Sequence, residues 1–448
     1  MANFIILTGY FEPEFTGIAV HATDLAKELA VLGHQVSVFT AMPFYPNWNI
    51  FPEYRRRLFY TENINKVKIH RNWLFVPDNK RGISTLKRMI HEISFVCLQF
   101  FNLLFHLKTI NKAERIIVFS PPFLQGINST ILSLLFRKQV IFHVEDIQPD
   151  SAVDLGMIDQ SGKKQRFIGI LHLLERLFYL TSRQVSTLTQ GMRENIESKI
   201  SNSRQDVILF PYWVDFDLFL KDPNARTRFR NRFSIANEKL IVGYAGNLGK
   251  KQNLDHLMDI AASPALDKDI QFLIAGEGAE KHTLIDRTKK LQLKNVSFLP
   301  LLKDQEYVDF LNGVDLSYIS QDVNADKIFI PSKLFKTLSC GSPMLCIANK
   351  NSELAKLIIA ANAGFIQGFN ELSETVSLLN SIAKEAKQLE IFGDKAYHFA
   401  RDEYNKDKII LNFLNDIGIV ANQKKREHYE SASYRKLRLN WIRDRSLL

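Results

Sequence analysis

The sequence predicts an α/β protein made of two doubly wound domains that face each other across a cleft. Its 448 residues are too many for one ordinary domain, and 46% hydrophobic residues are enough to fill two cores. Short apolar runs rich in Ile, Val and Phe alternate with longer helical runs, which is typical of right-handed βαβ units. The alternation stops near 215–237 and then starts again. Two such units in tandem bind ligand where the carboxyl ends of their strands face one another.

In the first half, seven short apolar runs are expected to be strands buried on both faces of a parallel sheet. They are residues 3–9, 35–41, 67–72, 115–120, 139–146, 184–189 and 206–210. Helices are expected between them at 17–32, 84–110, 123–136, 164–181 and 190–200.

In the second half, the stretch 221–238 is polar, charged and aromatic by turns, and strand-like runs follow it. These runs are residues 240–246, 270–275, 296–299, 314–319 and 343–347. We therefore predict two Rossmann-like doubly wound domains, 1–215 and 238–418, followed by a basic tail at 419–448.

Several protein classes are excluded by composition. The three cysteines (Cys97, Cys340 and Cys346) share no tight spacing, which argues against a disulfide framework or a zinc site and favours a reducing cytoplasm. The N-terminus resembles a buried strand rather than a signal peptide, and no apolar run is long enough to span a bilayer.

The net charge is +10, and residues 421–448 contribute eight basic and three acidic side chains. Without a recognisable nucleic-acid module, this charge favours anionic lipid or a phosphorylated ligand.

Four turns have the composition of anion-binding sites. Gly17 lies between the first strand and the first helix, although a plain strand-to-helix turn is equally compatible with a lone glycine. In the second domain, the turn 246–251 places Lys250 and Lys251 at a helix start, where the macrodipole disfavours them and a bound phosphate would relieve the conflict. A solvated surface pair is the alternative. The turns at 274–278 and 330–334 add glycines, a serine and a lysine. Together, the four turns fit the binding of a nucleotide diphosphate.

The order of seven motifs resembles the retaining glycosyltransferases of family 4, which have the GT-B fold, and more narrowly the colanic-acid, O-antigen and capsule transferases. The resemblance covers about residues 1–418. The motifs are Tyr-Phe-Glu-Pro-Glu-Phe-Thr-Gly-Ile (10–18), Gly-His-Gln-Val (33–36), Pro-Phe-Tyr-Pro-Asn-Trp-Asn (43–49), Val-Glu-Asp-Ile-Gln-Pro-Asp-Ser (144–151), Phe-Pro-Tyr-Trp-Val-Asp (210–215), Gly-Asn-Leu-Gly-Lys-Lys-Gln (246–252) and Pro-Ser-Lys-Leu-Phe-Lys-Thr-Leu-Ser-Cys-Gly-Ser-Pro (331–343).

The resemblance implies a nucleotide-diphosphate sugar as donor and no metal cofactor. Lys251 and Lys333 would neutralise the diphosphate, and the residues around Glu277 would form a wall around the nucleobase. The chain has Asn247 where broader family members have arginine, and Lys336 where they have glutamate, so its ribose and sugar contacts differ from theirs. The predicted donor-binding residues are Gly17, Asn247, Lys251, Gly276, Glu277, Gly278, Leu301, Asp326, Ser332, Lys333 and Leu334.

The predicted catalytic residues are His143, Glu145 and Asp146, at the end of strand 139–146. His143 and Glu145 share one strand face, and relatives have a histidine at the position of Glu145. In this family the leaving diphosphate can accept the acceptor proton, so no protein base is required. The alternatives are a buried structural role for His143 and a capping role for Asp146. His21 is a weaker candidate, because it reaches the site only if the helix phase permits.

Residues 86–110 are apolar with basic flanks, and ten of the thirteen residues at 93–105 are apolar. Such a segment can lie in a membrane interface or can be a core helix. The resemblance implies an undecaprenyl-diphosphate-linked acceptor, so we expect a peripheral protein at the cytoplasmic face of the cell membrane that makes a cell-surface polysaccharide. A sugar-nucleotide epimerase of the same architecture and a non-catalytic subunit of an assembly complex are the alternatives.

Overall fold

The computed structural model describes most of the chain, which forms two compact units. Among the described residues, unit 1 comprises Met1–Pro211 together with 410–419, and unit 2 comprises Tyr212–Ile409. Asp326 and the basic tail beyond Ile419 lie outside the described residues. The described residues are 1–14, 17–78, 85–150, 163–201, 203, 205–302, 304–321 and 330–419.

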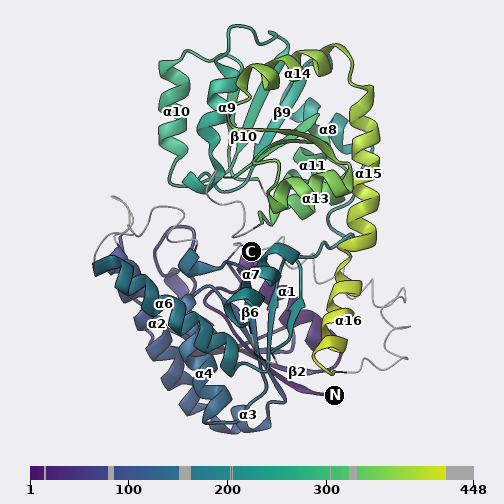
Figure 1. Cartoon of the computed structure of the whole chain (residues 1–448). Helices are drawn as coiled ribbons and strands as arrows, with labels where there is room; N and C mark the ends of the chain where they lie inside the picture. The colour runs from purple at the N-terminus through teal and green to yellow at the C-terminus, as the bar shows by residue number, and fades with distance from the viewer. Residues whose placement is uncertain are drawn as a thin grey trace. The chain divides into compact units, whose positions relative to one another are not determined.

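Unit 1 contains a sheet in the order β3-β4-β2-β1-β5-β6-β7-β8, which is parallel except for the antiparallel β3–β4 pair (Figure 1). All seven expected strands are present. The sequence did not indicate β3, because this edge strand has no fully buried residue and contains three consecutive polar residues, Thr61, Glu62 and Asn63. The strands are β1 (Asn3–Leu7), β2 (Gln35–Ala41), β3 (Phe59–Ile64), β4 (Val67–Asn72), β5 (Arg115–Ser120), β6 (Val140–Val144), β7 (Gln184–Thr187) and β8 (Val207–Leu209).

The helices of unit 1 connect these parallel strands. The expected single helix at 84–110 is wrong in one respect: it breaks at His106, where the backbone leaves helical geometry and the ring Nδ1 lies 2.8 Å from Asn102 O. The helices are α1 (Gly17–Val31), α2 (Thr85–Phe105), α3 (Leu107–Lys112), α4 (Gly126–Leu134), α6 (Lys163–Thr181) and α7 (Gln190–Lys199).

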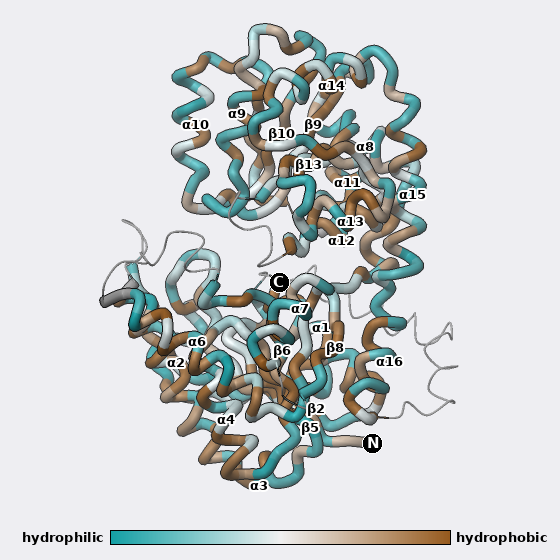
Figure 2. Tube along the Cα trace, in the orientation of Figure 1, coloured by the Kyte–Doolittle hydropathy of each residue, from teal (hydrophilic) through white to brown (hydrophobic). Residues whose placement is uncertain are grey.

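Unit 2 contains a fully parallel sheet in the order β11-β10-β9-β12-β13-β14. Its five expected strands are present, and the short, half-buried β14 is additional. Apolar residues gather along both sheets, as Figure 2 shows. The strands are β9 (Leu240–Ala245), β10 (Ile270–Ala275), β11 (Val296–Leu299), β12 (Leu316–Ser320), β13 (Met344–Ile347) and β14 (Gly364–Gln367). The helices are α8 (Ala225–Arg232), α9 (Leu254–Ala261), α10 (Lys281–Lys290), α11 (Asp304–Gly313), α12 (Lys333–Ser339), α13 (Glu353–Ala361), α14 (Leu372–Lys384) and α15 (Lys387–Glu403).

Helix α8 lies in the stretch that the sequence left irregular. It is highly charged, and ion pairs hold it together with the buried Phe229, whose ring contacts that of Phe310. Arg226 and Arg230 both bind the carboxylate of Asp315, and Arg230 Nη2 donates to Asp315 Oδ2 at 2.6 Å. The same oxygen accepts the N–H of Ile241 at 2.7 Å, which ties α8 to the start of β9.

Helix α16 (Lys406–Asp416) carries the chain from unit 2 back to unit 1. Phe413 stacks on Phe210 with 3.8 Å between ring centroids, and Arg115 Nε donates to Ile417 O at 2.9 Å. The C-terminal part of α16 therefore completes the core of unit 1. Among the described residues, no helix is both long and apolar enough to cross a membrane.

Candidate active site

The turn after β9 packs backbone to backbone against the turn after β10. Gly246 N–H donates to Ala275 O at 2.9 Å. A Cβ on Gly276 would lie 1.9 Å from Gly246 O, and both glycines have a φ of +143°. Only glycine fits at Gly276, because any side chain would collide with the neighbouring backbone. The two turns thus form one backbone surface at the carboxyl edge of the sheet, where parallel α/β sheets bind ligands.

The predicted nucleobase wall continues from this surface. Leu248 N–H donates to Glu277 O at 2.8 Å, and a Cβ on Gly278 would lie 2.3 Å from Leu248 O. The Glu277 carboxylate is exposed and pairs with Lys281 Nζ at 2.6 Å, while Leu301 is 58% exposed. The structure therefore places Glu277 and Gly278 against the β9 turn, and the nucleobase contacts themselves stay a prediction.

Lys333, the first residue of α12, points its ammonium into this edge of unit 2. The Nζ atom is buried, lies 3.7 Å from the centre of the Tyr244 ring, and has no hydrogen-bond acceptor among the residues that the structure describes. Burial lowers the pKa of the ammonium to about 7. A Cβ on Gly246 would lie 2.9 Å from Nζ, so the absence of a side chain there makes room for the lysine. The arrangement holds a buried cation without an anionic partner, which is energetically unfavourable unless an anion binds.

The neighbours of Lys333 differ in what they offer a ligand. Ser332 is half-buried and its hydroxyl does not cap α12, whereas Leu334 is fully buried and its N–H donates to Pro331 O at 3.0 Å. The Leu334 side chain is therefore part of the core of unit 2, and the place of this residue in the donor site stays a prediction. Lys336, which replaces the family's glutamate, has its Nζ 4.6 Å from the Phe219 ring centre.

The remaining predicted donor residues lie on surface turns. Lys251 is half-buried in the 3-10 turn η3 (Lys250–Gln252), and Asn247 is exposed while its carbonyl accepts the Tyr244 hydroxyl at 2.5 Å. Gly17 is the first residue of α1, in unit 1. Within unit 2 the structure thus brings the turns after β9 and β10 together with the start of α12.

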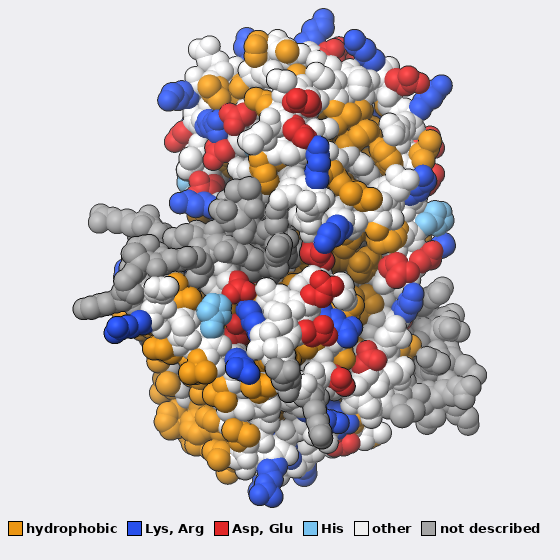
Figure 3. Space-filling view, in the orientation of Figure 1, with side chains coloured by type: hydrophobic (Ala, Val, Ile, Leu, Met, Phe, Trp, Pro, Cys, Tyr) orange, Lys and Arg blue, Asp and Glu red, His pale blue; other side chains and the backbone are white. Residues whose placement is uncertain are grey.

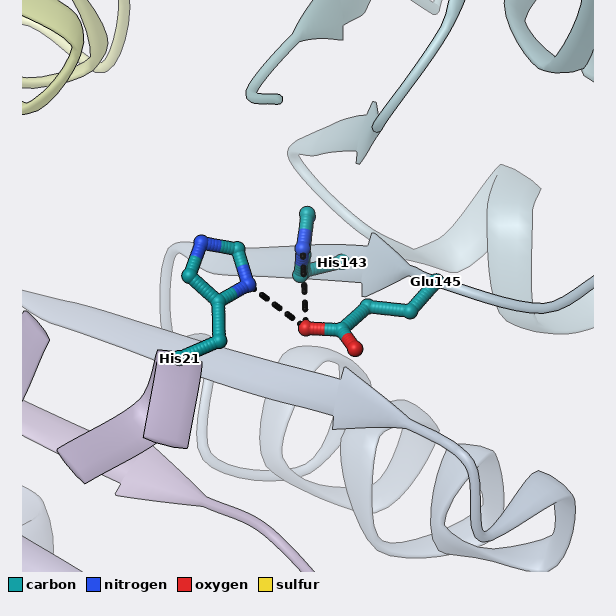
Figure 4. Close-up of side chains that lie close together, drawn as sticks. All are labelled: His21, His143 and Glu145. Atoms are coloured by element: carbon teal, nitrogen blue, oxygen red, sulfur yellow. Dashed lines mark hydrogen bonds and ion pairs between the residues drawn. The ribbon is translucent and has the colours of Figure 1, made fainter. Parts of the chain in front are cut away.

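In unit 1, the predicted catalytic strand end forms a buried cluster with α1 (Figure 4). His21 Nδ1 lies 2.6 Å from Glu145 Oε1, and His143 Nε2 lies 3.6 Å from the same oxygen. His21, His143 and Glu145 are 3%, 0% and 5% exposed. His143 Nδ1 lies 3.0 Å from Ser186 Oγ on β7. Asp146 is half-buried in the following loop.

The two imidazoles decide the charge of Glu145. Burial alone would raise the pKa of this carboxyl, but attraction to His21 and hydrogen bonding with both histidines outweigh it and lower the pKa to about 2. Burial lowers the pKa of His143. The cluster therefore favours an ionised carboxylate at the carboxyl end of β6, inside a shell that includes Phe119 and Phe210.

The same three side chains have ligand-type atoms within 4.8 Å of one another, so we tested their fit to a metal ion. Tetrahedral coordination with bonds of about 2 Å separates the ligand atoms by roughly 3.3 Å. The 2.6 Å between His21 Nδ1 and Glu145 Oε1 is shorter than this and is a hydrogen-bond distance. The contact between His21 and Glu145 is therefore a hydrogen bond in this structure, and the absence of a metal ion from the cluster stays a prediction.

Two protein families match the two units. Residues 16–213 match the family described as Glycosyl transferase 4-like domain, and residues 225–399 match Glycosyl transferases group 1. The chain belongs to these glycosyltransferases. The glycosyltransferase is 28% identical over 413 residues to the colanic acid biosynthesis glycosyl transferase WcaI of Escherichia coli (strain K12), which covers 91% of this chain and 97% of that protein. The resemblance noted in the sequence is confirmed.

Solved glycosyltransferase structures share the fold. Anabaena HepE in complex with UDP superposes with a TM-score of 0.68 at 13% identity, over 93% of this chain and 99% of that one. WaaG, a glycosyltransferase involved in lipopolysaccharide biosynthesis, superposes with a TM-score of 0.66 at 14% identity, over the same shares. The predicted α/β class and GT-B fold are confirmed for the glycosyltransferase.

Sequence reasoning did not assign two residues of these clusters. His21 is only a weak candidate in the sequence because the phase of its helix is not determined there, and the structure places it against Glu145. Tyr244 lies in the middle of a buried strand pattern, two residues before a glycine turn, and the strand pattern alone does not distinguish it from a core residue. A polar aromatic residue at that place was the signal available for Tyr244.

Proposed function

We propose that this glycosyltransferase transfers a sugar from a nucleotide-diphosphate donor, with retention, to an undecaprenyl-diphosphate-linked acceptor during synthesis of a cell-surface polysaccharide. The names of its relatives support the process: they include WcaI in colanic acid biosynthesis and WclY of Escherichia coli in O-antigen biosynthesis. The structures of HepE with UDP and UDP-glucose support a nucleotide-sugar donor.

The observation that carries the donor proposal is the buried ammonium of Lys333. It lies beside the glycine turn after β9, in the space that Gly246 leaves by having no side chain. A donor diphosphate would supply the missing negative charge, and Lys251 lies on the next turn of the chain. Charge-assisted hydrogen bonds of this kind are about twice as strong as neutral ones.

The chemistry needs few protein groups. The acceptor hydroxyl oxygen bonds to the anomeric carbon while the bond from that carbon to the donor phosphate breaks, and the hydroxyl proton passes to the leaving phosphate oxygen. Positive charge that develops on the sugar can be stabilised by a fixed carboxylate, and Glu145, whose pKa is lowered, is our candidate for this role in unit 1. Lysines and backbone N–H groups take the charge-neutralising role that a metal has in other transferases.

The experiment that tests the donor proposal is a thermal-shift screen of UDP- and GDP-sugars, followed by transfer assays. The correct donor should raise the Tm of the wild-type protein by mass action. Product that retains the anomeric configuration is expected only when a lipid-linked acceptor is added. Donor hydrolysis or epimerisation without acceptor would instead support an epimerase, and the lack of any Tm shift would remove the donor proposal.

A surface of unit 1 supports action at the cytoplasmic face of the membrane. Helix α4 packs beside α6 and α2, and large apolar side chains on all three are exposed (Figure 3). We call this surface the three-helix apolar face. It consists of Leu86, Ile90, Ile93, Phe101 and Phe105 on α2, Ile127 and Leu134 on α4, and Ile170, Leu173, Leu177 and Leu180 on α6.

The charges of these helices favour an anionic bilayer over a protein partner. The acidic residues on α2, α4 and α6 are Glu92, which is half-buried, and Glu175, which is 2% exposed. Exposed basic residues include Lys87, Arg88 and Arg176. A surface with exposed apolar and basic side chains and no exposed acid matches the interface of an anionic membrane.

Helix α2 has two roles in this proposal. Phe95 is 1% exposed and packs in the core of unit 1, whereas Phe101 and Phe105 are 50% and 69% exposed. The core-helix interpretation therefore applies to one face of α2, and membrane contact is proposed for the other.

A further inference from the structure

Glu145 has its backbone fixed by the sheet on both sides. Its N–H donates to Ser120 O on β5 at 2.9 Å, and the hydroxyl of Thr187 on β7 donates to the preceding carbonyl, Val144 O, at 2.9 Å. The freedom that remains lies in the side chain. The partners of its carboxylate therefore determine where the negative charge lies.

The closest of these partners comes from a different element. His21 projects from the first turns of α1 and reaches Glu145 Oε1 at 2.6 Å across 124 residues of sequence. Its ring is fixed by edge contact with Phe119 at 5.5 Å and by a tilted contact with Phe210 at 5.2 Å between centroids. Helix α1 thus places an immobilised imidazole N–H of His21 against the Glu145 carboxylate.

Two histidines face Glu145 among the residues that the structure describes. His21 faces it from α1 and His143 faces it from β6. Ser186 from β7, Phe119 from β5 and Phe210 after β8 pack around the histidines and carry no charge. A buried carboxylate without its hydrogen-bond donors would favour the protonated form, because burial penalises charge.

We propose that His21 is a positioning residue for glycosyl transfer, which keeps Glu145 ionised and holds its Oε1 toward the carboxyl edge of β6. This inference rests on the proposed function, because it requires sugar transfer to depend on the Glu145 charge. The resemblance noted in the sequence implies a histidine in relatives at the position of Glu145, and in this chain His21 on α1 contacts the carboxylate at that position.

The test compares His21→Phe with His21→Asn in steady-state transfer assays across pH 4 to 9. Phenylalanine keeps the ring but cannot donate, so kcat at neutral pH should fall about 10- to 100-fold, as for partners that orient a functional group elsewhere. The KM for donor should stay within about twofold, because the donor phosphate contacts proposed above lie in unit 2. The pKa of Glu145 should rise, so activity of the phenylalanine variant should fall with decreasing pH at a higher pH than in the wild type.

Two further variants make the result specific. Asparagine carries an N–H near the position of His21 Nδ1, so His21→Asn should recover most of the kcat and the wild-type pH profile. Glu145→Gln removes the negative charge, so the transfer activity of this variant should be low and should not fall further as the pH is lowered. If His21→Phe lowers only the Tm, with an unchanged pH profile, or if asparagine restores nothing, the positioning role is wrong.

Proton NMR separates this inference from the proposed function. The short bond between His21 and Glu145 should give a strongly deshielded imidazole N–H signal that is absent in His21→Phe and Glu145→Gln. A wild-type protein that shows the signal but transfers no sugar would defeat the proposed function. A protein that transfers sugar with equal kcat in all His21 variants would defeat this inference alone.

Discussion

The ammonium of Lys333 lies 3.7 Å from the centre of the Tyr244 ring, in space that Gly246 leaves open. The aromatic ring attracts the cation but does not replace a hydrogen-bond acceptor. The three residues come from β9, the turn after it and α12, so the fold of unit 2 creates the position. This relationship gives two predictions about the donor.

Lys333→Ala should weaken donor binding. Loss of one charge-assisted contact costs about 1.5 to 3 kcal/mol, which corresponds to roughly 10- to 150-fold in Kd. Lys251→Ala should act in the same direction, with a smaller effect because its side chain is more exposed. Titration calorimetry measures both, and Lys356→Ala on the exposed face of α13 serves as the control. If all three variants bind the donor with the same affinity, Lys333 and Lys251 do not contribute to the donor site.

Donor binding should take up a proton above neutral pH. Burial lowers the Lys333 pKa to about 7, so the free protein is largely deprotonated there at pH 8, and the bound diphosphate should raise this pKa again. Affinity should therefore decrease as pH rises from 7 to 9, and calorimetry in buffers of different ionisation enthalpy should show proton uptake. Lys333→Met should abolish the uptake, and uptake that persists in this variant would assign it to another group.

Transfer activity should survive EDTA. The lysines beside the glycine turns are expected to neutralise the diphosphate without a metal, and the His21–Glu145 distance of 2.6 Å is a hydrogen bond. Assays after exhaustive chelation should match untreated controls. Activity that is lost on chelation and restored by magnesium or manganese would contradict the metal-free prediction.

The sequence predicted the parallel strands well because strands buried on both faces produce short, almost continuous apolar runs. It missed β3 and β14 because each is an edge strand with no fully buried residue, so neither gives such a run. It missed α8 because ion pairs of Arg226 and Arg230 with Asp315 help to hold this helix. Ion pairs do not produce the apolar periodicity from which helices are predicted.

As with the fold, the sequence predicted one part of the candidate site and missed another. Turns that follow parallel strands meet at one edge, so the proximity of the turns after β9 and β10 follows from topology. The pairing of His21 with Glu145 depends on the rotation of α1 about its axis, which local sequence does not determine. The return of the chain to unit 1 depends on Phe413 stacking on Phe210, a contact between residues far apart in the sequence.

The last prediction concerns the three-helix apolar face. Phe101→Asn on α2 and Leu173→Asn on α6 remove side chains that are 50% and 68% exposed, so neither should lower the Tm appreciably. If this face lies in the bilayer interface, each substitution removes about 1.5 to 3 kcal/mol of apolar burial. The double variant should then be released from phosphatidylglycerol-containing vesicles in a sedimentation assay.

Matched controls identify the cause of release. Ile359→Asn on α13 changes an apolar residue that is 62% exposed on unit 2 and should leave vesicle binding intact. Phe95→Ala should instead destabilise unit 1 by about 3 to 5 kcal/mol, because its ring is 1% exposed. High salt should weaken binding through Lys87 and Arg88 but leave the apolar part, since salt screens only the charges. If the double variant still binds vesicles, or if it converts a wild-type dimer to monomer, the face is a protein interface and not a membrane surface.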